Sequence, residues 1–104
     1  MDEKTREKLD KKGWNIGTTR DFLGLSDEEM QIVELRSALG RMLREKRTAI
    51  GLTQTLLAER IGSSQSRVAK METGDSSVSI DLILRSLFRI GASNRDICNY
   101  VSRL

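Results

Sequence analysis

The chain has 104 residues, which is enough for one domain that buries an apolar core. It contains no histidine and a single cysteine, Cys98, which excludes an intramolecular disulfide and the usual zinc and nucleophile–base sites. Residues 1–30 carry six basic and eight acidic residues, whereas residues 31–104 carry twelve and seven. A basic globular part is typical of a domain that meets phosphate groups, although an ordinary solvated surface explains this imbalance equally well.

The composition favours an all-α fold, because the chain lacks proline and its long segments are rich in aliphatic helix formers. Residues 1–12 are charged throughout, so we expect neither a secretory signal nor a membrane-spanning helix, and a cytoplasmic location. We find no carboxylate pair in an apolar setting and no phosphate-cradling glycine-rich loop. The sequence therefore predicts a protein that is not an enzyme and that needs no cofactor and no metal.

Residues 1–25 are expected to form a partly flexible extension, and residues 26–104 a single domain. Ser26 followed by Glu29 is a capping box, which opens a long helix that stops at Gly51. Its apolar stripe recurs at three- and four-residue spacing and comprises Ile32, Leu35, Leu39, Leu43 and Ile50. Gly40 inside this helix marks either a close packing contact or a point where the helix divides.

Shorter helices follow, each opened by a hydroxyl-bearing N-cap residue. They are predicted over 54–61, 65–73, about 80–90, and from 94 onward, with N-caps at Thr53, Ser64, Ser79, and either Ser93 or Asn94. Glycines follow the first three, and residues 75–77 are turn material. The last helix carries a stripe that either closes its own core or pairs with a second copy: Ile97, Tyr100, Val101 and Leu104.

The two short helices over residues 53–74 are joined by a glycine-containing turn, which is the arrangement of a DNA-binding helix-turn-helix. Val68 and Met71 of the second helix are expected to face the core. Its outward face then carries side chains that suit base edges: Gln65, Ser66, Arg67 and Lys70. Four polar residues alone would indicate only a solvated helix face, but their place inside the spaced motif favours contact with DNA.

Residues 43–92 resemble the Cro/repressor-type helix-turn-helix family, also called the XRE family. The matching residues fall in order without gaps: Gly51-Leu52-Thr53-Gln54, Leu57-Ala58, Ile61-Gly62, Ser64-Gln65-Ser66, Val68, Glu72 and Gly74. The resemblance implies a lambda-repressor-like domain of about five helices that binds double-stranded DNA as a transcriptional regulator. Because one recognition helix reads few base pairs, we expect a homodimer on a palindromic operator.

The resemblance also assigns roles by position. It implies that Gln54 grips a phosphate and braces the recognition helix, and that Arg47 and Glu72 form an internal ion pair. Bases would be read by Gln65, Ser66 and Lys70, with Arg67 close by. Helix N-termini and the loop after the recognition helix add the remaining expected phosphate contacts: Thr53, Ser64, Ser76 and Ser77. Other basic residues are either phosphate contacts or ordinary surface charges, namely Arg36, Arg41, Arg44 and Lys46.

The flanking residues are similar to HigA-type antitoxins. The similarity involves Gly13-Trp14, Phe22-Leu23-Gly24-Leu25, Ser26 and Glu34-Leu35-Arg36. It implies an alternative function in which the chain neutralises a small ribonuclease toxin and binds DNA for autoregulation. The apolar residues of the extension either form a partner-binding patch or cover the domain's own core: Trp14, Ile16, Phe22, Leu23 and Leu25.

Overall fold

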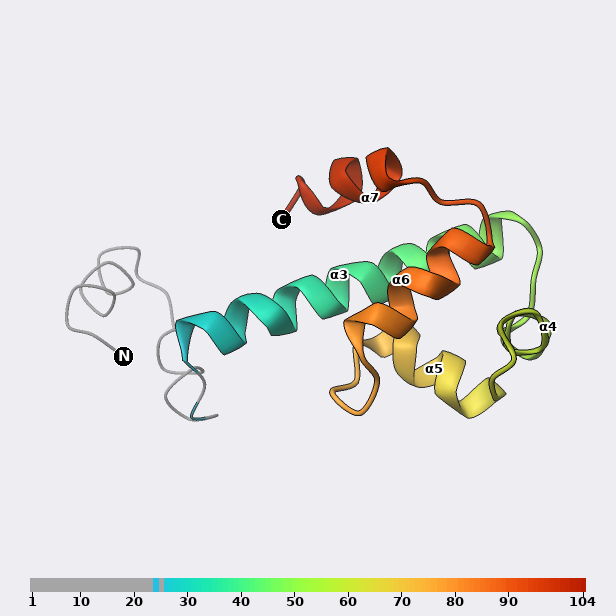
Figure 1. Cartoon of the computed structure of the whole chain (residues 1–104), viewed down its shortest axis with the longest axis horizontal. Coiled ribbons are helices and arrows are strands. Elements are labelled where there is room, and N and C mark those ends of the chain that lie inside the picture. The colour runs from blue at the N-terminus through green and yellow to red at the C-terminus, as the bar shows by residue number, and fades with distance from the viewer. Residues whose placement is uncertain (1–23, 25) are drawn as a thin grey trace. The chain divides into compact units, whose positions relative to one another are not determined.

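The computed structural model describes Gly24 and residues 26–104, which contain five α-helices and no strand (Figure 1). The helices are α3 (Asp27–Ala49), α4 (Gln54–Ile61), α5 (Gln65–Thr73), α6 (Ile80–Arg89) and α7 (Asn94–Val101). The predicted all-α, lambda-repressor-like fold is thereby confirmed. Val33–Leu104 form one compact unit, and no described helix is long and apolar enough to cross a membrane.

Local capping chemistry sets the ends of the short helices. At each N-cap a hydroxyl oxygen accepts the backbone N–H three residues further on; the caps are Thr53, Ser64, Ser79 and Ser93. Gly62 and Gly74 end α4 and α5 with φ values of 66° and 71°, the left-handed region that disfavours side chains. The predicted boundaries of α4 and α5 are confirmed, and Ser93 rather than Asn94 caps α7.

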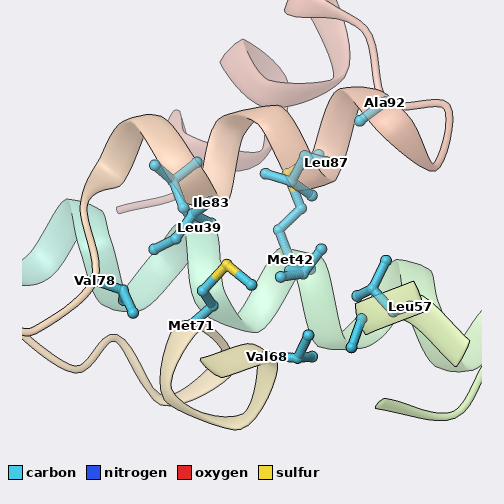
Figure 2. Close-up of a cluster of buried hydrophobic side chains, with 11 residues drawn as sticks. Leu39, Met42, Leu57, Val68, Met71, Val78, Ile83, Leu87 and Ala92 are labelled. Carbon is cyan, nitrogen blue, oxygen red and sulfur yellow. The ribbon is translucent and has the colours of Figure 1, made fainter. Parts of the chain in front are cut away.

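The core is aliphatic and is built from the middle of α3 together with α4, α5 and α6 (Figure 2). Its buried members are Leu39, Met42, Leu43, Leu57, Ala58, Val68, Met71, Val78, Ile83, Leu87 and Ala92. Val68 and Met71 face this core, as predicted. Because they occupy the inner side of α5, its polar residues are left on the outside.

The predicted stripe of α3 is buried only over its middle. Leu39 and Leu43 are fully enclosed, but Ile32 and Ile50 at its two ends are 45% and 52% exposed. Periodicity identifies the face of a helix that can pack, but it does not reveal how far other helices extend along that face. The apolar residues of the extension, from Trp14 to Leu25, lie outside the described residues.

Gly40 marks a close packing contact, because α3 runs through this position without a break. A Cβ at residue 40 would collide with the carbonyl oxygen of Met71 and lie 3.0 Å from that of Glu72. Ser37 lies one turn before Gly40 in α3, and a Cβ on Gly74 would lie 2.9 Å from the Cα of Ser37. Two glycines therefore allow α3 to touch the backbone at the C-terminal end of α5.

The terminal helix α7 packs on its own domain through one apolar face. Ile97, Tyr100 and Val101 are partly buried against the core, whereas Leu104 is 61% exposed. Burial, followed by a hydrogen bond involving Glu45 of α3, raises the pKa of the Tyr100 hydroxyl. These contacts favour the alternative in which the predicted stripe of α7 closes its own core.

Gly40→Ala is expected to lower the free energy of unfolding by about 1–3 kcal/mol, the usual cost of overpacking against atoms that cannot move. The same substitution at an exposed helical position would stabilise the helix by about 1 kcal/mol. Chemical denaturation of the full chain measures the difference. Arg44→Ala, on the exposed side of α3, is the control and should change stability by less than about 0.5 kcal/mol. A stabilised Gly40→Ala variant would show that the two backbones are not in contact.

The start of α7 is expected to loosen in acid. The Asp96 carboxylate accepts the backbone N–H of Ser93 at 2.9 Å, which lowers its pKa below the ordinary 3.8. A carboxyl with a lowered folded pKa stabilises the fold above its unfolded pKa, and this contribution is lost as pH falls through the folded value. An NMR titration of the Ser93 amide should therefore show a midpoint below 3.8. A midpoint at or above 3.8, or no change in Asp96→Asn relative to the parent chain, would contradict this.

Candidate nucleic-acid interface

Helices α4 and α5 form a compact helix-turn-helix. The chain leaves α4 through Gly62, and the N–H of Ser63 returns to the carbonyl oxygen of Ala58 at 2.8 Å. Ala58 is buried where α4 and α5 pack together, and Val68 lies below it in the core. The small side chain of Ala58 permits this close packing. The packing of α4 on α5 holds α5 in an orientation in which one of its faces points away from the domain.

The outward face of α5 carries the four side chains for which the sequence predicts base contacts. Gln65, Ser66, Arg67 and Lys70 are all exposed. They begin at the first residue of the helix, where recognition helices carry their reading residues. Amide, hydroxyl and guanidinium groups provide both donors and acceptors for base edges.

A shallow hollow of about 230 Å³ lies beside this face. Its walls come from the start of α5 and from the loop that follows the helix, and they comprise Ser64, Ser66, Arg67, Lys70, Ser77 and Val78. Two cations and three hydroxyl groups face the same space, which suits a phosphate group. The structure brings these five predicted contact residues together, whereas Thr53 and Gln54 lie at the start of α4 and Ser76 is not part of the lining.

An ion pair between Arg47 and Glu72 lies behind α5, at the two positions for which the sequence predicts one. The Nε of Arg47 donates to Oε2 of Glu72 at 2.5 Å, and Nη2 donates to Oε1 at 3.0 Å. A third donor, Nη1, binds the carbonyl oxygen of Leu52 at 2.8 Å. The side chains are 11% and 3% exposed, so this pair is largely withdrawn from water and joins α3, α5 and the turn before α4.

The ion pair continues outward through two glutamines. Nε2 of Gln54 donates to Oε1 of Glu72 at 3.0 Å, and Oε1 of Gln54 accepts from Nε2 of Gln65 at 2.6 Å. A carboxylate can only accept, so the amide nitrogen of Gln54 must face Glu72 and its oxygen must face Gln65. The buried charge therefore sets the orientation of an amide group at the exposed start of α5.

This network includes a contact that sequence reasoning missed. The resemblance implied that Gln54 braces the recognition helix, but it did not reveal that Gln65 is the residue it holds at the exposed end. The two glutamines are far apart in the sequence, and no spacing rule pairs them. The hydrogen bond between Arg47 and Glu72 also raises the pKa of Arg47, which agrees with a permanently charged centre for the network.

The loop after α5 is shaped by Asp75, another residue that the sequence did not single out. Its Oδ1 accepts the backbone N–H of Ser77 at 2.8 Å. Hydrogen bonds from Ser77 lower the pKa of this carboxyl, and the charges of Lys70 and Arg36 lower it further. The only available signal was the turn-forming composition of residues 75–77. Asp75 turns the exposed Ser77 toward the hollow beside α5.

The Arg47→Met variant is expected to lose about 3–5 kcal/mol of unfolding free energy, because it leaves the Glu72 carboxylate buried without its cation. Arg47→Met combined with Glu72→Leu should regain a large part of this loss. Urea denaturation of both variants measures the effect. Asp81→Asn serves as the control, since the Asp81–Arg85 pair is 72% and 77% exposed and should contribute less than about 1 kcal/mol. A double variant as unstable as the single one would contradict the expectation.

Comparison with known proteins finds a family match inside this region. Residues 43–85 match the family described as helix-turn-helix, a span that includes the end of α3, all of α4 and α5, and the first half of α6. No curated protein and no solved structure matches the chain. The matched span contains every predicted base and phosphate contact. Residues 43–85 are therefore similar to a helix-turn-helix of the XRE type, and this similarity supports a DNA-binding transcription regulator.

Proposed function

We propose that this protein binds a palindromic DNA operator as a homodimer and acts as a repressor or autoregulator, with α5 in the major groove. The observation that carries the proposal is the outward face of α5, where four base-reading side chains stand on a helix fixed from behind by a buried ion pair. Sites built on rigid elements hold reading residues in one geometry. In this proposal the Arg47–Glu72 pair provides that rigidity.

Gln65 is proposed to read an adenine. One N–H of its amide donates to Gln54, which leaves the other N–H and the oxygen for a base. An amide with one free donor and one free acceptor matches N7 and N6 of adenine. Arg67 is suited to the O6 and N7 atoms of guanine, and Ser66 and Lys70 complete the reading surface.

Phosphate contacts are proposed at the starts of α4 and α5 and in the loop after α5. The hydroxyl oxygen of Thr53 accepts a backbone N–H, which leaves its hydrogen to donate to a phosphate. Gln54 keeps one free N–H for the same purpose. The hydroxyl oxygen of Ser64 also accepts a backbone N–H, and this hydroxyl shares a hydrogen bond with that of Ser66 at 3.2 Å. Ser76 and Ser77 of the loop after α5 are exposed, and Ser77 lines the same hollow as Ser64. These contacts would give affinity and register, while the base contacts give the choice of sequence.

A twofold arrangement follows from the limited reach of one helix. A single recognition helix reads only a few base pairs, and two copies would read two half-sites about 34 Å apart, one helical turn of DNA. The expected operator is therefore a palindrome. In this proposal, dimerisation must leave α5 and the loop after it uncovered.

Selection of bound fragments from random DNA by the full chain, at two salt concentrations, tests the proposal first. We expect one enriched palindrome and weaker binding at higher salt, because phosphate contacts release counterions. Enrichment of no sequence would overturn the proposed function. Analytical ultracentrifugation of the complex should show two copies for each operator.

Arg67→Ala is expected to weaken operator binding by about 1–3 kcal/mol and to relax the choice of base at one position. Gln65→Ala should relax the preference for adenine at a neighbouring position. Fluorescence anisotropy on the selected operator and on single-base variants measures both effects. Arg95→Ala removes an exposed cation of α7, outside the motif, and should leave base preference unchanged. Equal losses for Arg67→Ala and Arg95→Ala would show that α5 does not read bases.

The antitoxin function remains the second candidate. It draws on the resemblance of residues within 13–36, and those before residue 26, apart from Gly24, lie outside the described residues. One observation favours a protein partner: Ile32 and Val33 at the start of α3 are 45% and 40% exposed. Arg67→Ala separates the two functions, because it should weaken operator binding and leave binding of a ribonuclease toxin intact.

A further inference from the structure

Helix α3 begins at Asp27, well before the family match at residue 43. Two residues of α3 that precede the match, Ser37 and Gly40, pack against the C-terminal end of α5 and the loop after it. Gly40 meets the carbonyl oxygens of Met71 and Glu72, and Ser37 meets Gly74 at the start of the loop after α5. Residues outside the matched span therefore lie beside the DNA-facing loop, and they are candidates for contacts that the family match does not contain.

Arg36 is the basic residue directly before Ser37 in this part of α3. It lies eleven residues before Arg47, which is close to three helical turns, so the two arginines share one side of α3. Arg47 uses three of its donors within the protein. By contrast, Nε of Arg36 is buried and has no hydrogen-bond partner among the described residues. Arg36 is only partly exposed, so its stem is held against the protein, with Nε withdrawn from water and unpaired.

Arg36 interacts electrostatically with the loop after α5. Its charge acts on Asp75, together with the charge of Lys70. Asp75 already accepts the N–H of Ser77, and no carboxylate lies within ion-pair distance of Arg36 in the part of the chain that the structure describes. The positive charge of Arg36 therefore compensates the negative charge of Asp75, although the two side chains form no ion pair. This arrangement lowers the repulsion that an acidic loop would exert on a DNA phosphate.

We propose that Arg36 binds a phosphate of the DNA backbone beside the loop of residues 75–77, extending the interface beyond the helix-turn-helix match. The inference rests on the proposed function, since it adds a contact to the same complex. A guanidinium that forms no ion pair within the described part of the protein, on a stem held by packing, loses little freedom when its terminal Nη groups meet a phosphate. The contact is independent of sequence, because a phosphate carries no base identity.

The test compares Arg36→Met and Arg36→Lys with the parent chain. Arg36→Met keeps an apolar stem and removes the charge, and Arg36→Lys keeps the charge. Fluorescence anisotropy is measured on the selected operator and on a scrambled duplex of equal length, over a series of salt concentrations. Circular dichroism and thermal denaturation confirm that each variant is folded. Arg95→Met, which removes an exposed cation of α7 outside the motif, is the matched control.

Arg36→Met is expected to weaken binding to both duplexes by a similar factor, about 3- to 10-fold, and to reduce the salt slope by about 0.9 for each arginine removed. Arg36→Lys should retain the slope, and Arg95→Met should match the parent chain. The ratio of operator to scrambled affinity should stay constant in all variants.

Two results would overturn the inference and leave the proposed function intact. One is parental affinity and salt slope in Arg36→Met. The other is a loss confined to the operator with an unchanged slope, which would mean that Arg36 shapes the loop without touching a phosphate. A parent chain that prefers no sequence would instead overturn the proposed function, and the inference with it.

Discussion

The buried carboxylate of Glu72 is the constraint on which the outward face of α5 depends. It is withdrawn from water, so it must be neutralised and fully hydrogen-bonded, and Arg47 and Gln54 satisfy it. Because a carboxylate cannot donate, each amide further out has only one compatible orientation. The order created by one buried charge thus reaches Gln65 at the surface, where an amide free to rotate would discriminate poorly between bases.

Backbone contact provides a second constraint on the same helix. Gly40 removes the side chain that would separate α3 from the end of α5, and Gly74 does the same opposite Ser37. The N-terminal end of α5 is fixed by the glutamine network and its C-terminal end by this close packing. A helix held at both ends can enter a groove without losing much conformational freedom.

The charges around α5 divide into those used inside the protein and those left for a ligand. Glu72 and Asp75, the acidic residues at its C-terminal end, are occupied by internal hydrogen bonds. Arg67 and Lys70 face outward beside the hollow. The surface that DNA would meet is therefore more basic than the modest net charge of +3 indicates. Arg36 extends the same division to a part of α3 outside the family match.

The sequence by itself determined the boundaries of the short helices and the helix-turn-helix, because capping by Thr53 and Ser64 involves residues three positions apart. It also indicated which side of α5 faces outward, through the spacing of Val68 and Met71. Only the tertiary structure decided between the two meanings of Gly40, limited the buried stripe of α3, and joined Gln54 to Gln65. The physical reason is distance along the chain: capping is local, whereas packing and buried hydrogen bonds join segments whose meeting no local pattern encodes.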